Sequence, residues 1–208
     1  MGTPVTFTPD NEPYLGRQLL YQFDQVILSA MEVNEQVSSE SCGDLSPLQR
    51  AACQIIPQGF SIALSIRELI RQGYLLSAEI LIRPLVERAA TISYLVEGES
   101  ALSIWERGWN YKERPSLSRR LLLMRGEDPD ERQSDIGAVF VDRFNSMVHG
   151  DPASAERNLG VTFSGEVGYL SSKNLCSPEK CDEICSYASM FLVVLLSRAA
   201  QIFPVRKR

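Results

Sequence analysis

The sequence predicts an all-α protein, a helical bundle of about five long helices with shorter helices between them. Long stretches repeat apolar residues at the spacing of one helix face. Almost no stretch alternates apolar and polar residues, as a half-buried strand does. The exception is Gly160–Leu170, where two short runs around Ser164-Gly165 predict one small β-hairpin.

The expected helices are bounded by capping residues, glycine and proline. Ser46-Pro47 is a typical start, a capping side chain followed by proline at the first helical position. Gly73 ends the helix that begins at Pro47, and Gly98 ends the helix after it. The long helices are expected over residues 14–38, 47–72, 75–96, 130–148 and 178–203, and the shorter ones over residues 101–113 and 115–124.

The first two helices carry more specific expectations. Pro57 and Gly59 predict a kink or a break near Gln58, because proline removes a backbone hydrogen bond inside a helix. The first helix is expected to turn one apolar face inward. That face comprises Leu15, Leu19, Leu20, Phe23, Ile27, Leu28 and Met31.

Composition points to a folded soluble protein with a single domain over residues 1–208. The net charge of -5 argues against sequence-blind binding to nucleic acid. No basic region followed by an apolar run opens the chain, so no secretory signal is expected. The run Met190–Leu196 is too short for a membrane span and predicts a buried helix segment. We therefore expect a cytoplasmic protein without a membrane partner.

The five cysteines favour reduced thiols, because the count is odd and no export signal is visible. Neither a metal nor another cofactor is expected. One alternative is a thiol-based metal or redox sensor built on Cys176, Cys181 and Cys185, with Cys53 as a distant fourth ligand. Their spacing is not that of a zinc knuckle. This favours the alternative that the cysteines are small apolar side chains of the core.

A locally basic segment runs from Trp105 to Arg125, with six basic residues and two acidic ones. Aromatic side chains interleave with the basic ones, as in a groove that stacks and neutralises single-stranded RNA. Inward packing of the aromatics with arginines on the surface is the alternative. The candidate substrate-binding residues are Arg114, Arg119, Arg120 and Trp109.

The third helix is apolar on nearly every side, as in a central helix. Its charged residues Glu79, Arg83 and Glu87 recur every four positions and predict an acid, base, acid ladder along one side. Buried charges persist only when they are paired. We therefore expect this ladder to be a structural polar element.

His149 is the single histidine of the chain, so a zinc site with two histidines cannot form. Arg143 precedes it by six positions and falls within the apolar stripe of its helix. One imidazole and one guanidinium suit metal-free phosphodiester cleavage, because the first moves a proton and the second holds a phosphate. Structurally, His149 could instead stabilise a helix C-terminus while Arg143 pairs with Glu68 or Glu87.

The arginine and histidine separated by five residues on a late helix resemble the signature of the HEPN superfamily, whose active members are metal-independent ribonucleases. The resemblance implies a homodimer with a composite cleft. It implies that Arg143 binds the scissile phosphate, that His149 exchanges a proton and that the ribose 2'-hydroxyl attacks. The family usually has a polar residue directly after the arginine, and here Phe144 stands there. Asn145 comes one position later and would orient His149 from the same helix face.

A second resemblance covers residues 60 to 155. The segment Ile82–Glu87 with Tyr94-Leu95, then Trp105–Tyr111, then Met147–Gly150, is similar to a bacterial family of uncharacterised helical proteins. In that family an arginine and a glutamate on a central helix precede a late histidine and glycine. The similarity implies the helical fold.

Two functions follow as expectations. The first is a ribonuclease of HEPN type, a toxin or defence effector with an RNA substrate and with Arg143, His149 and Asn145 at its site. The second is a non-catalytic helical interaction module with a protein partner: an antitoxin, a sensor or an assembly subunit. Phe144 in place of a polar residue motivates the second.

Overall fold

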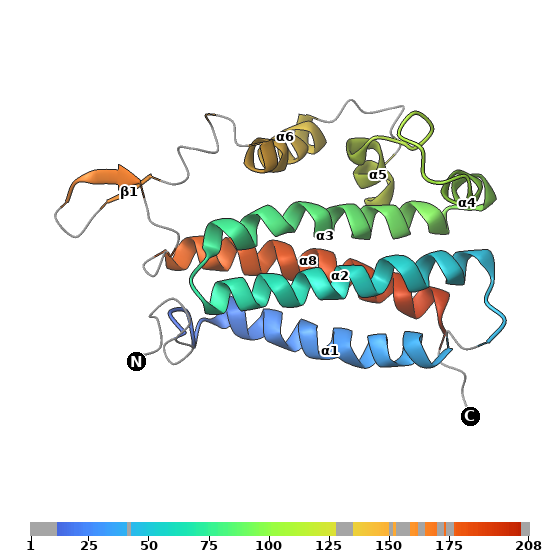
Figure 1. The fold of residues 1–208 in the computed structure, drawn as a ribbon, viewed down its shortest axis with the longest axis horizontal. Helices are drawn as coiled ribbons and strands as arrows, with labels where there is room; N and C mark the ends of the chain where they lie inside the picture. Colours follow the sequence, from blue (N-terminus) through green and yellow to red (C-terminus); the bar gives the residue numbers. More distant parts are fainter. Residues whose placement is uncertain are drawn as a thin grey trace, which may run out of the picture.

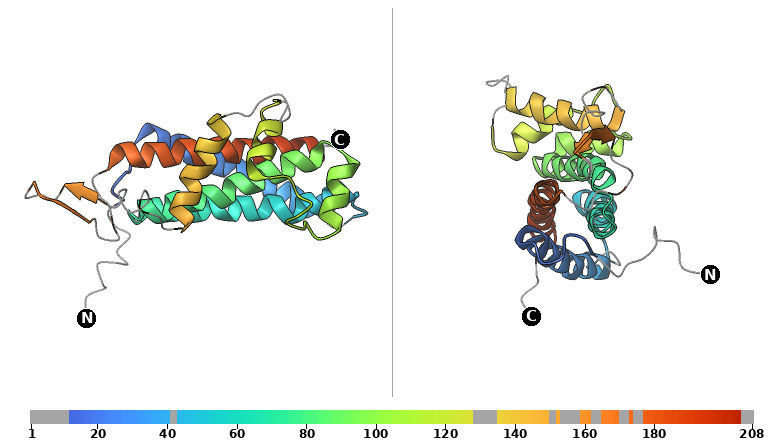
Figure 2. Two further views of the ribbon diagram at one scale, coloured as in Figure 1. Left: turned by 90° about the horizontal axis from the view of Figure 1, so that it is seen from above. Right: turned by 90° about the vertical axis from the view of Figure 1, so that its left-hand side faces the viewer.

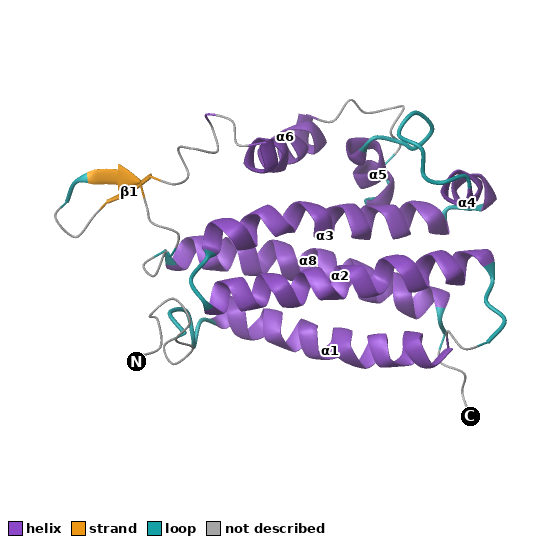
Figure 3. Cartoon of the chain, in the orientation of Figure 1, coloured by secondary structure: helices purple, strands orange, loops and turns teal. Residues whose placement is uncertain are grey.

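A computed structural model describes residues 12–40, 43–127, 135–149, 152, 159–161, 165–169, 173 and 177–204. It confirms the all-α class, with one small hairpin beside the helices (Figure 3). The helices are α1 (Gln18–Glu40), α2 (Pro47–Arg71), α3 (Leu75–Val96), α4 (Glu99–Glu106), α5 (Leu117–Met124), α6 (Asp135–His149) and α8 (Pro178–Ile202). The strands are β1 (Leu159–Val161) and β2 (Val167–Tyr169).

Four long helices, α1, α2, α3 and α8, form a bundle (Figure 1). The end-on view in Figure 2 shows them at the corners of a square, with α1 and α3 on one diagonal. Short loops make α2 antiparallel to both α1 and α3. The fourth helix, α8, runs parallel to α1 and α3, because the chain returns along the bundle between α3 and α8 (Figure 1).

That return forms a second layer on α3. Helices α4 and α5 lie near one end of α3 and α6 nearer the other (Figure 1). In the hairpin β1 and β2 pair antiparallel, with Gly160 opposite Gly168, which confirms the predicted hairpin. The expected helix over 101–113 is wrong in its second half. Gly108 and Trp109 adopt positive φ angles of 96° and 55°, which an α-helix cannot accommodate.

Helix α2 begins as predicted. Ser46 accepts from the backbone of Gln49 at 3.2 Å and donates its own backbone N–H to the Gln49 side chain at 3.0 Å, a complete capping box. Of the predicted kink or break near Gln58, the break is wrong, because α2 continues through Pro57, and the kink stays a prediction. Buried side chains on both sides of the proline hold the helix together, and tertiary packing outweighs the lost hydrogen bond.

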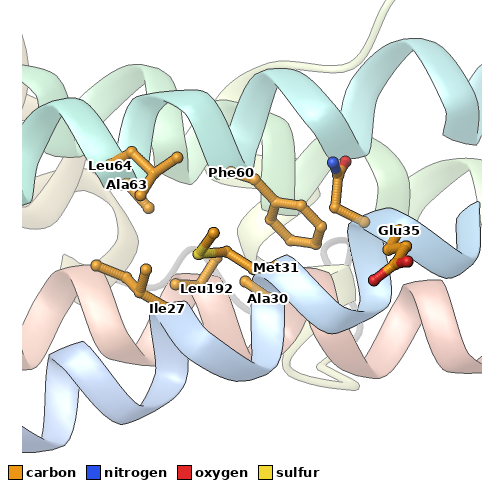
Figure 4. Close-up of a pocket in the computed structure, with 9 residues that line it drawn as sticks. Ile27, Ala30, Met31, Glu35, Phe60, Ala63, Leu64 and Leu192 are labelled. Carbon is orange, nitrogen blue, oxygen red and sulfur yellow. The ribbon is translucent and has the colours of Figure 1, made fainter. Parts of the chain in front are cut away.

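Helix α1 contributes a narrower buried face than the sequence predicts. Leu20, Phe23 and Ile27 are buried, whereas Leu15, Leu28 and Met31 are exposed. The face continues instead through Ala30 and Val37. Met31 lies at the edge of an apolar hollow of about 200 Å³ between α1 and α2, with Phe60 and Leu64 on the facing helix and Leu192 of α8 also lining it (Figure 4).

Helix α8 is long and apolar enough to cross a membrane by length and composition. The core helix of a helical bundle meets the same criteria, so one such helix is weak evidence for a membrane span. In this structure Phe191, Leu192 and Leu195 are buried within the bundle, while Met190 and Val193 are exposed. The predicted buried segment is thus confirmed in part. The cytoplasmic location stays a prediction.

Candidate functional site

Arg143 lies where α6 crosses the bundle. Its Nη2 is 3.1 Å from Oε1 of Glu79 on α3 and 2.6 Å from Oε1 of Glu183 on α8. The Glu79 carboxylate is only 3% exposed and also forms an ion pair with Lys180 of α8. Two cations and two carboxylates therefore meet in one cluster, so the charges of the cluster balance.

The environment of Arg143 favours a permanently charged, fixed side chain. Its guanidinium lies 5.5 Å from the ring centroid of Tyr187 on α8, a cation–π distance. Burial opposes the charge, but hydrogen bonds to Glu79 and Glu183 outweigh burial and raise the pKa of Arg143. The sequence left two alternatives for this arginine, a paired position in the interior or an orientation toward a cleft, and the structure shows it paired and half-buried. Its partners are Glu79 and Glu183, and the expected Glu68 or Glu87 is wrong.

The residue after the arginine serves packing. Phe144 is 2% exposed, and its ring meets Tyr187 edge-on with centroids 6.0 Å apart. Edge-to-face pairs of this kind add to the free energy gained from burial alone. The phenylalanine that departs from the HEPN pattern is thus an anchor between α6 and α8.

His149 is the last residue of α6 and is exposed. It has no hydrogen bond or ion pair to any described residue. A separation of six residues on an α-helix places two side chains about 9 Å apart along the axis and about 120° apart around it. Arg143 and His149 therefore point in different directions within one chain. Asn145, which lies between them in the sequence, is half-buried.

The predicted ladder on α3 forms only in part. Arg83 pairs with Glu87 at 3.3 Å. Glu79 instead meets Arg143 and Lys180, because these two cations reach the side of α3 that faces α6 and α8. Glu79 thus belongs to a cluster of charged side chains from α3, α6 and α8. Only Arg83 and Glu87 pair along α3 itself.

A second group of charged residues surrounds a cavity of about 200 Å³ between α2, α3 and the segment from α4 to α5. It brings together three of the four residues predicted to bind substrate: Arg114, Arg120 and Trp109. The fourth, Arg119, is exposed and does not line the cavity. The remaining lining residues are Ile55, Gln58, Glu87, Arg88, Thr91 and Trp105.

Arg120 is unusual within this cavity because it is 5% exposed. Its Nη1 donates to Oγ1 of Thr91 at 2.5 Å, and its guanidinium lies 5.5 Å from the ring centroid of Trp109. No carboxylate in the described ranges pairs with it, and its buried Nε has no acceptor there. Burial lowers the pKa of Arg120 to about 10; Glu87 opposes this shift, and the positive charges of Arg114, Arg83 and Arg88 add to it.

The described cysteines are free thiols. Cys181 and Cys185 are buried with their Sγ atoms 4.0 Å apart, and Cys53 is half-buried. Within the described ranges no three histidine, cysteine or acidic side chains are placed to hold a metal ion. Cys176 lies outside the described residues, so the metal site proposed for Cys176, Cys181 and Cys185 stays a hypothesis.

Sequence reasoning missed the partners on α8. Lys180, Glu183 and Tyr187 follow one another at helical spacing, so they share one face of an otherwise apolar helix. That spacing is the signal that could have identified them. Comparison of the chain with protein-family models, with curated proteins and with solved structures finds no match.

Proposed function

We propose that this chain is a non-catalytic helical interaction module, in which Arg143 fastens the outer layer to the bundle. The observation that carries the proposal is the pairing of Arg143 with both Glu79 and Glu183. A phosphate bound at Arg143 would stand beside two carboxylates. It would also have to displace Glu79, which would take a cation away from a nearly fully buried carboxylate.

Contact with another protein chain is part of the proposal. Large apolar side chains are exposed on α1 and α2, where Met31 is 56% exposed and lines the hollow of Figure 4 together with the exposed Leu64. Large apolar side chains gathered on a surface typically mark an interaction site. We place the contact of a homodimer on this face.

The ribonuclease remains the second candidate, and one observation favours it. His149 is exposed and has no partner among the described residues, so its imidazole is accessible for proton transfer. A nuclease of this kind would need Arg143 and His149 from two copies to converge. Its dimer would therefore join the α6 helices near His149.

One experiment separates the two functions. Single-stranded RNA is incubated in EDTA with the wild-type protein and with His149→Ala. The module predicts no cleavage by either protein. Cleavage by the wild type that His149→Ala abolishes would establish the nuclease and overturn the module.

The mode of association gives a second, independent test. We expect Met31→Glu to dissociate the dimer in size-exclusion chromatography with light scattering, because it places a charge in the apolar face. Val148→Glu is the matched control, since Val148 is also exposed and adjoins His149. Dissociation by Val148→Glu alone would favour the nuclease, and a monomeric wild type would refute the dimer.

A further inference from the structure

The cavity at Arg120 contains an arginine whose charge is not neutralised by the described part of the chain. Arg120 is 5% exposed, yet its hydrogen-bond partner in the described structure is the neutral hydroxyl of Thr91. A buried charge is costly unless it is paired and hydrogen-bonded. Arg143 shows the usual solution in the same protein, because two carboxylates surround it.

The free part of Arg120 is the part that binds oxyanions. Nη1 is used by Thr91, which leaves the edge formed by Nε and Nη2 without an acceptor in the described residues. This edge can donate two parallel hydrogen bonds to two oxygens of one anion. Trp109 compensates the charge only through its ring face, at 5.5 Å from the guanidinium.

The surroundings of the cavity add positive charge. Arg88 and Arg114 line it as well, and neither forms an ion pair in the described structure. Arg88 donates to the neutral amide of Gln58 at 2.9 Å, and Arg114 lies over the ring of Tyr111. The single carboxylate of the lining, Glu87, is already paired with Arg83. The lining thus contains three guanidinium groups, and its one carboxylate is already neutralised by an arginine outside the lining.

Size and lining restrict the ligand. A cavity of about 200 Å³ has room for a phosphate group with a small substituent. Three guanidinium groups suit an anion of charge near -2 with several oxygens. Trp105 and Trp109, with ring centroids 5.5 Å apart, provide an aromatic wall beside them.

We propose that this cavity is a binding site for a small phosphate-bearing ligand, held by the free edge of Arg120 with Arg88 and Arg114 around it. This inference goes beyond the interaction module and does not depend on it, because the cavity shares no residue with the Arg143 cluster. A ligand bound here would link α3 to the α4–α5 segment. The module would then be a sensor of that ligand.

The chain supplies its own probe for this site. Its two tryptophans, Trp105 and Trp109, both line the cavity, so tryptophan fluorescence reports on it alone. The wild-type protein is titrated with inorganic phosphate and with phenyl phosphate at constant ionic strength. We expect a saturable change with both. Tighter binding of phenyl phosphate would show that the ligand is an aromatic phosphoester, and equal binding would indicate free phosphate.

Matched variants make the test specific. Arg114→Gln is an exposed change at the cavity and should weaken phosphate binding by about 10-fold, the loss of one charge-assisted hydrogen bond. Arg119→Gln is the control, because this exposed neighbour does not line the cavity, and it should bind as the wild type does. A fluorescence response that is absent, that does not saturate or that is equally weakened in both variants would overturn the site.

A third variant separates binding from folding. Arg120→Met should abolish the fluorescence response and at the same time raise the melting temperature without phosphate, because it removes an unpaired buried charge. A purely structural arginine predicts the opposite, a lower melting temperature. Retention of the wild-type phosphate response by Arg120→Met would refute the assignment.

Discussion

Glu79 and Arg143 join two layers of the protein through one ion pair, in which Nη2 of the arginine lies 3.1 Å from a carboxylate that is nearly fully buried. The same carboxylate meets Lys180, so three helices converge on a single side chain. Glu183 contacts the arginine from the more exposed side, at 2.6 Å. The two glutamates thus have the same chemistry but differ in burial.

That difference leads to the first prediction. Glu79→Gln should lower the free energy of unfolding by about 3 kcal/mol, because it leaves two cations without their buried partner. Glu183→Gln should cost less than about 1 kcal/mol, since its carboxylate is accessible to water. Urea unfolding of both variants checks the comparison. Equal losses would show that Glu79 is not the centre of the cluster.

The second prediction concerns how α6 is held. In Arg143→Gln the amide cannot neutralise Glu79 and Glu183, so α6 should separate from the bundle more readily than the long helices do. Amide hydrogen exchange should therefore accelerate in α6 and change little in α1 and α2. Arg107→Gln is the control, because its ion pair with Glu113 at 2.7 Å is exposed. Faster exchange throughout the chain would mean a global loss of stability instead.

The position of Arg143 could be predicted from the sequence, but its partners could not. A helical wheel places this arginine within the apolar stripe of α6, which indicates either an interior pair or an orientation toward a cleft. The identity of the partner depends on which long helix crosses α6 and at what height. Glu79 stands 64 residues away in the chain, and no local pattern encodes that distance. The same holds for Thr91, which is 29 residues from Arg120.

The helices themselves were largely predictable because local signals define them. The capping box at Ser46 and the glycine after α3 gave boundaries close to the observed ones. Two errors arose where another effect outweighed the local signal. Packing against α8 keeps α2 continuous at Pro57, and positive φ angles at Gly108 and Trp109 end the helical segment early.

The third prediction is a pH dependence at the start of α8. The hydrogen-bonded ion pair with Arg17 holds the pKa of Asp182 below its ordinary value. A lowered pKa in the folded state stabilises the protein above the unfolded value of about 4, and this contribution is lost as the pH falls through the folded value. Asp182→Asn should therefore be less stable than the wild type at pH 7.

The difference should vanish on acidification. Unfolding free energies of the wild type and Asp182→Asn, measured between pH 7 and pH 2, should converge at the acidic end because both side chains are then neutral. Glu32→Gln is a suitable control, since this carboxylate is exposed and has no ion pair in the described structure. A difference that stays constant across the range would contradict the linkage.

The fourth prediction tests the close approach of α2 and α8. A Cβ added at Gly59 would collide with Cδ1 of Leu195, a fully buried side chain. Gly59→Ala gains about 1 kcal/mol in helix propensity but forces this leucine to move, which costs about 1 to 3 kcal/mol in a packed core. We expect a net loss of about 1 kcal/mol.

A double-mutant cycle isolates the clash. Leu195→Ala alone should cost about 3 kcal/mol through the cavity that it leaves. In the double variant the alanine methyl group at position 59 occupies part of that cavity, so the combined loss should be smaller than the sum of the two single losses by about 1 kcal/mol or more. Additive losses in urea unfolding would show that α2 and α8 adjust their separation freely, because then neither side chain would sense the other.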